Sequence, residues 1–150
     1  MLKSFWTLTV MMLAFAGMSI AADAPYAGTW KLNVAQSKIR PGPPPQNLTV
    51  TIIPGGETTV KGMDPEGKPF TWTFTPSEGV AVPITGLAPG STVTQTRPNE
   101  RSVKEIWKVG KGHSVRHAVI SKDGKSFTYT IKGTNENGQN ENSVMVFEKE

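Results

Sequence analysis

The sequence of 150 residues contains no cysteine. This absence excludes disulfide bonds, thiol nucleophiles and zinc sites with cysteine ligands. The folded chain must therefore be held together by apolar burial and by hydrogen bonds alone. It is long enough to bury a sizeable core as one domain of ordinary size.

Runs of like charge are also missing. The chain has a net charge of +4, but its lysines and arginines are scattered along the sequence. A nucleic-acid-binding domain normally gathers its basic residues in one patch or stripe, so we expect no nucleic acid as a partner. Solvated surface is the plainer interpretation of these basic residues.

Few residues are suited to metal binding or catalysis. The only histidines are His113 and His117. On a strand they would lie ~13 Å apart, which is too far for one metal ion. The sequence has no Gly-x-Ser-x-Gly elbow, phosphate-binding loop or nucleotide-binding fingerprint. We therefore expect no metal site, no cofactor and no enzymatic activity.

The N-terminus has the pattern of a cleavable secretory signal. Lys3 is followed by an apolar run from Phe5 to Ile20 and then by the small residues Ala21 and Ala22. We predict a signal peptide at residues 1–22 and a single domain at 23–150. A retained membrane anchor is the weaker alternative, because the run contains polar residues and is short for a span of ~20 residues.

Helical periodicity is almost absent after this segment. Short alternating stretches are separated by Gly, Pro, Asn and Asp, which is typical of β-strands and turns. One helical turn is expected from Asn33 to Ile39, since Asn33 and Gln36 have the spacing of a helix cap and Pro41 would end the turn. The proline-rich residues 40–46 should be stiff and extended.

Two stretches repeat the same pattern: "EGKPFTWTF" at 66–74 and "DGKSFTYTI" at 123–131. In each copy a glycine stands where a turn needs positive φ, and aromatic residues then alternate with threonines. One face of each strand is therefore apolar and the other polar. No acid, base or nucleophile recurs with the pattern, so we interpret it as one hairpin module that is used twice.

About ten such strands follow one another with short connections, which predicts an antiparallel up-and-down meander. An open meander of this length would leave two exposed edges, and closure into a barrel removes them. The predicted fold class is therefore an all-β meander β-barrel of about eight to ten strands, with room inside for side chains or one small ligand.

The stretch "GTWKLN" at Gly28–Asn33 resembles the Gly-x-Trp signature of the calycin superfamily, which contains the lipocalins, the fatty-acid-binding proteins and the avidins. With "PGPPP", "DGK" and the late "KGTN", the mature chain resembles uncharacterised exported lipocalin-like proteins of soil bacteria. The resemblance implies a lipocalin-like barrel with Gly28 and Trp30 at its closed base. It also implies an exported protein, periplasmic or extracellular, in a bacterium.

Some family features are missing. Lipocalins usually set an arginine against the signature tryptophan, and here the last strand offers Lys149. Fatty-acid-binding proteins hold the ligand carboxylate with an Arg-x-Tyr pair, whereas Tyr129 has no arginine two residues before it. They also insert two helices after the first strand, where this chain has its proline-rich residues.

The strand "SVKEIWKV" is expected to turn Glu105 and Trp107 inward, because lysines alternate with them on the opposite face. On the next strand His117 is expected inward, where it would form an unusual buried pair with Glu105. The alternative places Glu105 at the barrel mouth and makes His117 an ordinary core residue. The candidate cavity residues are Phe70, Trp72, Phe74, Glu105, Trp107, His117, Phe127 and Tyr129.

The expected function is the binding of a small apolar or amphipathic ligand by an exported, monomeric barrel. The alternative is a structural or protein-interaction barrel whose interior is filled by side chains. An integral membrane barrel is not favoured after signal cleavage, since its outer face should be an apolar band. The faces opposite the aromatic residues carry threonine and lysine instead.

Overall fold

The computed structural model describes residues 24–150, which form ten β-strands and no helix. The predicted signal peptide lies outside the described residues and stays a prediction. Within the described residues, no helix is long and apolar enough to cross a membrane. The strands are β1 (Gly28–Lys38), β2 (Asn47–Ile52), β3 (Thr58–Met63), β4 (Pro69–Phe74), β5 (Ala81–Pro83), β6 (Thr92–Asn99), β7 (Ser102–Val109), β8 (Gly112–Ile120), β9 (Ser126–Thr134) and β10 (Asn140–Lys149).

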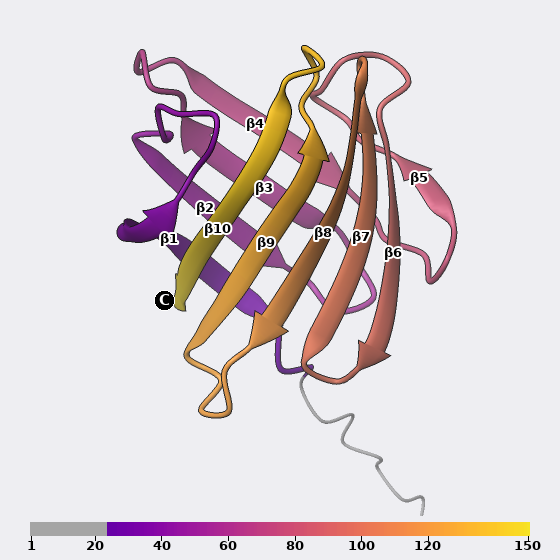
Figure 1. The fold of residues 1–150 in the computed structure, drawn as a ribbon. Coiled ribbons are helices and arrows are strands. Elements are labelled where there is room, and N and C mark those ends of the chain that lie inside the picture. Colours follow the sequence, from indigo (N-terminus) through magenta and orange to yellow (C-terminus); the bar gives the residue numbers. More distant parts are fainter. Residues whose placement is uncertain (1–23) are drawn as a thin grey trace, which may run out of the picture.

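All ten strands belong to one antiparallel sheet in the order β4-β3-β2-β1-β10-β9-β8-β7-β6-β5. Consecutive strands pair with each other, except β4 and β5, which are the two ends of the sheet, and β1 also pairs with β10. The sheet curls so that β6 to β10 cross in front of β2 to β4, and β1 bends around the side between them (Figure 1). The predicted all-β meander barrel is therefore confirmed.

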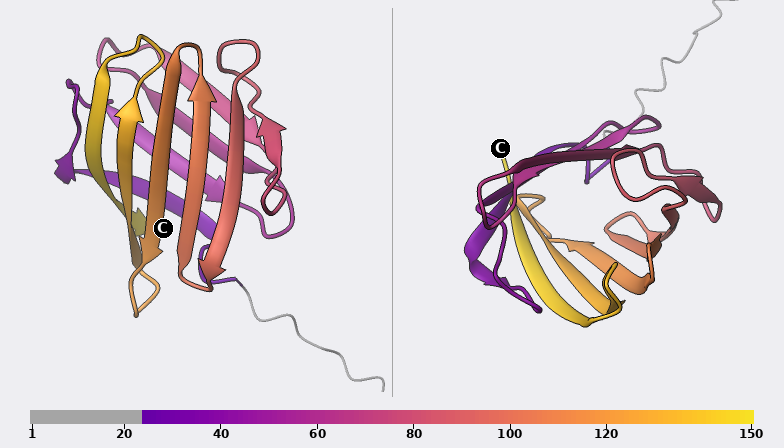
Figure 2. Two further views of the ribbon diagram at one scale, coloured as in Figure 1. Left: turned by 45° about the vertical axis from the view of Figure 1, so that its right-hand side comes forward. Right: turned by 90° about the horizontal axis from the view of Figure 1, so that it is seen from above.

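The two ends of the sheet meet at Thr73, in β4, and Thr85, which follows β5. Each residue donates its backbone N–H to the other's carbonyl oxygen at 2.9 Å. Gly86 permits this approach, because it has φ +96° and a side chain there would lie 2.3 Å from the Thr71 carbonyl oxygen. The barrel is thus nearly closed, as the view from above shows (Figure 2).

The helical turn predicted at 33–39 is wrong, because β1 stays extended to Lys38. The register between β1 and β10 shifts between Asn33 and Lys38, which is the mark of a β-bulge. The cap-like contact does form inside this bulge: the Gln36 N–H donates to Asn33 Oδ1 at 3.1 Å. The Val146 N–H donates to Ser37 Oγ at 2.9 Å, so pairing with β10 keeps the segment in the sheet.

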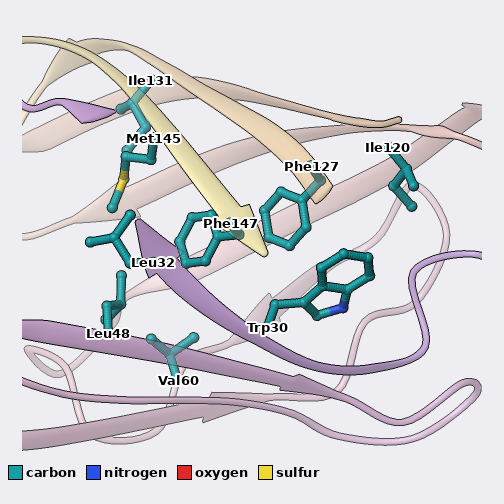
Figure 3. Close-up of a cluster of buried hydrophobic side chains, with 9 residues drawn as sticks. All are labelled: Trp30, Leu32, Leu48, Val60, Ile120, Phe127, Ile131, Met145 and Phe147. Atoms are coloured by element: carbon teal, nitrogen blue, oxygen red, sulfur yellow. The ribbon is translucent and has the colours of Figure 1, made fainter. Parts of the chain in front are cut away.

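The largest group of buried apolar side chains surrounds Trp30 (Figure 3). Trp30 is fully buried, and its Nε1 donates to the Tyr26 carbonyl oxygen at 2.9 Å. Its ring meets Phe127 edge to face at 4.9 Å between centroids, and Phe127 stacks on Phe147 at 4.6 Å. These contacts tie the first strand of the barrel to its last two.

Candidate ligand-binding cavity

The barrel is hollow. A cavity of about 470 Å³ lies inside it and is lined by residues from eight of the ten strands, β1 and β5 being the exceptions. This volume falls within the range of ~300–1,000 Å³ that is usual for small-molecule sites. The alternative of a barrel filled by its own side chains therefore does not describe this structure.

Seven of the eight predicted cavity residues line this space: Phe70, Trp72, Phe74, Glu105, Trp107, Phe127 and Tyr129. The aromatic rings among them pack on one another. Phe70 stacks on Trp72 with 4.9 Å between centroids, and Phe74 meets Trp107 edge to face at 5.6 Å. The alternating aromatics of the two repeated hairpins thus lie on the inner face.

His117 is the exception, and its predicted inward position is wrong. It is exposed, and the inner face of β8 carries Ser114, Arg116, Ala118 and Ile120 instead. Because successive residues of a strand face opposite sides, the prediction that His117 points inward implied that Arg116 points outward. Inside the barrel its guanidinium carbon lies 4.2 Å from the centroid of the Trp107 ring, and its Nε donates to Ser114 Oγ at 3.1 Å. These contacts compensate in part for the hydration that the guanidinium group loses inside the barrel.

Glu105 is buried, with 6% of its surface exposed, and three neutral side chains donate to its carboxylate. Gln95 Nε2 lies 2.9 Å from Oε1, Trp107 Nε1 lies 2.7 Å from Oε2, and the Tyr129 hydroxyl lies 2.5 Å from Oε2. A buried carboxylate is costly unless such donors compensate it. The alternative that Glu105 lies at the barrel mouth is therefore not what the structure shows.

Burial raises the pKa of Tyr129 well above its ordinary value, and the negative charge of Glu105 raises it further. The tyrosine hydroxyl therefore keeps its proton and donates a hydrogen bond to Glu105. Burial also lowers the pKa of Arg97, an effect that the charge of Glu105 opposes. The Tyr129 and Arg97 side chains are thus electrostatically linked to the same carboxylate.

Two arginines flank this carboxylate. Arg116 on β8 is the register partner of Glu105 on β7. Arg97 on β6 donates from Nη2 to Gln95 Oε1 at 3.0 Å, and its guanidinium carbon lies 3.5 Å from the centroid of the Tyr26 ring. Both arginines line the cavity.

Four of these polar residues are not among the predicted cavity residues: Gln95, Arg97, Ser114 and Arg116. A usable signal was present for two of them. In the stretch "TVTQTRP" at 92–98, Val93, Gln95 and Arg97 alternate with threonines. This is the same alternation that places the aromatics of the repeated hairpins on the inner face.

The cavity therefore has two unlike walls. Strands β6 to β9 supply the polar cluster around Glu105, whereas β2 to β4 supply apolar side chains. The apolar wall includes Leu48, Val50, Ile52, Val60, Phe70 and Trp72. Pro43 and Pro45, from the proline-rich connection between β1 and β2, complete part of the lining. Among residues 24–150, no group of three or more His, Asp and Glu side chains is placed to hold a metal ion.

Known structures share this fold. The chain is similar to a fatty-acid-binding protein of Schistosoma mansoni solved in complex with arachidonic acid, with 13% identity, TM-score 0.52, and coverage of 85% of this chain and 97% of the other. Fatty-acid-binding protein 1 of Echinococcus granulosus gives 14% identity, TM-score 0.51, and coverage of 83% and 97%. A variant of the fluorescent protein UnaG gives 13% identity, TM-score 0.54, and coverage of 84% and 96%.

These likenesses define the class of fold, a β-barrel similar to that of fatty-acid-binding proteins, and at such low identity they show the fold alone. No family model matches the chain, and no curated protein sequence matches it either.

Proposed function

We propose that this protein is exported and binds a small hydrophobic or amphipathic molecule inside its barrel. The observation that carries this proposal is the hollow interior of about 470 Å³, in which an apolar wall faces a polar one. Ligand pockets usually combine a mostly apolar lining with a few placed polar groups. An amphipathic molecule matches both walls at once.

The similar structures support the proposal at the level of fold. Two of them are named as fatty-acid-binding proteins, and one was solved with arachidonic acid. A role in binding rather than catalysis also agrees with the cavity chemistry, because the carboxylate of Glu105 and the hydroxyl of Tyr129 are occupied with each other.

The direct test is native mass spectrometry of the protein purified from its own host compartment. We expect a second mass that corresponds to a bound small molecule, together with binding of the neutral fluorescent probe N-phenyl-1-naphthylamine to the emptied protein. A single unliganded mass together with no probe binding would contradict the proposal.

A pair of neighbouring substitutions locates the site. Ala118 lines the cavity, whereas Val119 lies on the outer face with 53% of its surface exposed. Ala118→Trp should fill part of the interior and abolish probe binding, and Val119→Trp should leave binding unchanged. Equal probe binding by both variants, with circular dichroism showing intact strands, would place the site outside the barrel.

A further inference from the structure

We infer that the polar group of the ligand is an uncharged hydrogen-bond donor, a hydroxyl or an amide, and that Glu105 selects it against the corresponding acid. This inference rests on the proposed function and deepens it. The protein's own buried carboxylate already belongs to the polar wall of the cavity.

The first reason is that the neutral hydrogen-bond donors around Glu105 already point to its carboxylate. Gln95, Trp107 and Tyr129 come from three different strands, and all three donate to Glu105 at 2.5–2.9 Å. The Trp107 N–H, the Tyr129 O–H and one N–H of Gln95 are committed to Glu105 and are not free for a second acceptor. An acid group on the ligand therefore finds most of the donors around Glu105 already occupied.

The second reason is the charge of the lining. Among the described residues, the cavity lining carries one buried negative charge, that of Glu105, and two guanidinium groups, those of Arg97 and Arg116. Asp64, Glu136 and Glu141 also border the cavity, but none of these three is buried. Two carboxylates that share a site of low dielectric repel each other, and the second one is kept from ionising. A cation is disfavoured beside Glu105 as well, because Arg116 is its register partner.

The third reason is an open acceptor position on Glu105. Each carboxylate oxygen has two lone pairs. Within the described part of the chain, Oε2 accepts from both Trp107 and Tyr129, whereas Oε1 accepts from Gln95. One lone pair of Oε1 therefore remains for a donor on the ligand. A hydroxyl that donates to this oxygen also offers its own lone pairs to a nearby guanidinium N–H.

Two probes of equal chain length test the inference: dodecanol and dodecanoate. Each is titrated against the protein loaded with N-phenyl-1-naphthylamine, and its dissociation constant is taken from the displacement curve. We expect the wild-type protein to bind dodecanol ~10-fold or more tightly than dodecanoate, since the alcohol gains a hydrogen bond to a charged acceptor and the ionised acid has no donor for it. In Glu105→Gln, which removes the charge and keeps the size, we expect this preference to vanish or reverse.

Glu100→Gln is the matched control, because Glu100 is an exposed residue of the loop between β6 and β7 and its substitution removes the same charge outside the cavity. It should keep the wild-type preference. Wild-type protein that binds dodecanoate as well as dodecanol, or better, would overturn the inference while leaving the proposed function standing, and this result does not depend on the folding of any variant. Failure of the probe and of both ligands to bind would overturn the proposed function together with the inference.

Discussion

The ammonium group of Lys149 lies over the buried ring of Trp30, with 5.4 Å between the nitrogen and the ring centroid. Lys149 and Trp30 are register partners on β10 and β1, the last and first strands of the barrel. A lysine thus occupies the place where the calycin resemblance leads one to expect an arginine. Gly28 makes room for it, because a Cβ there would lie 3.2 Å from Lys149 Cε.

We therefore predict that Gly28→Ala destabilises the protein more than an ordinary turn substitution does. Gly28 has φ +117°, a conformation that L-residues rarely adopt, and the added methyl group would also displace Lys149. The expected loss is about 2–3 kcal/mol, measured as the free energy of unfolding in urea. Gly55→Ala is the control, since Gly55 has φ +68° with nothing near its missing side chain, and it should lose only about 1 kcal/mol. Equal losses would show that the contact with Lys149 is unimportant.

The hydrogen bond from Tyr129 to Glu105 gives a second prediction. Tyr129→Phe removes a donor to a buried carboxylate, so the free energy of unfolding at neutral pH should fall by about 1.5–3 kcal/mol. Thr128→Ala, at the exposed neighbouring position of β9, should change it by less than about 0.5 kcal/mol. An unchanged stability of Tyr129→Phe would mean that Gln95 and Trp107 satisfy the carboxylate without the tyrosine.

Tyr129 and Glu105 should also make the stability of the folded protein depend on pH in the alkaline range. The pKa of Tyr129 is raised in the folded protein, first by burial and then by the charge of Glu105. A group whose pKa is raised by folding stabilises the folded state fully below the pKa that it has in the unfolded chain, which is about 10 for tyrosine. This contribution to the free energy of unfolding is lost as the pH rises above that value. Wild-type stability should therefore decrease more steeply than that of Tyr129→Phe above pH ~10. Parallel pH profiles of urea unfolding would argue against this linkage.

Much of the fold could be predicted from the sequence, because polar and apolar residues alternate regularly in the strands that pair. The glycine turns and alternating aromatics of the repeated hairpins predict β4 and β9, whose aromatic residues line the cavity. The lysines of β7 likewise point to the inner position of Glu105. In these strands one face is clearly more polar than the other, so the period of two residues decides the orientation.

The site was predictable only in part, because both faces of β8 carry a basic side chain. His117 and Arg116 are neighbours on opposite faces, so only one of them can point into the cavity. Arg116 does so, and there it contacts Trp107 and Ser114. Such contacts follow from strand register, which a single sequence does not fix. The bulge in β1 has the same origin, since pairing with β10 overrides a local capping pattern.

Export gives a further prediction. Residues 1–22 have the pattern of a secretory signal, so the full chain expressed in a bacterial host should be recovered outside the cytoplasm. The intact mass of the recovered protein should correspond to cleavage after Ala22 or Ala24. Replacing apolar residues near the middle of the run with arginine, as in Leu13→Arg with Phe15→Arg, should retain the uncleaved chain in the cytoplasm. Cytoplasmic recovery of the unaltered chain at its full mass would contradict the prediction.

Closure of the barrel depends on Gly86, which gives the last prediction. A Cβ at this position would lie 2.3 Å from the Thr71 carbonyl oxygen, a distance at which β4 and the segment after β5 must separate. Gly86→Ala should therefore break the hydrogen bonds between Thr73 and Thr85, so that their amide protons exchange with solvent at least ~10-fold faster. Gly90→Ala is the control, because Gly90 has φ +82° and open space around its missing side chain. If the Thr73 and Thr85 amide protons exchange equally slowly in both variants, the two ends of the sheet are held together by other contacts, such as the packing of Phe74 on Trp107.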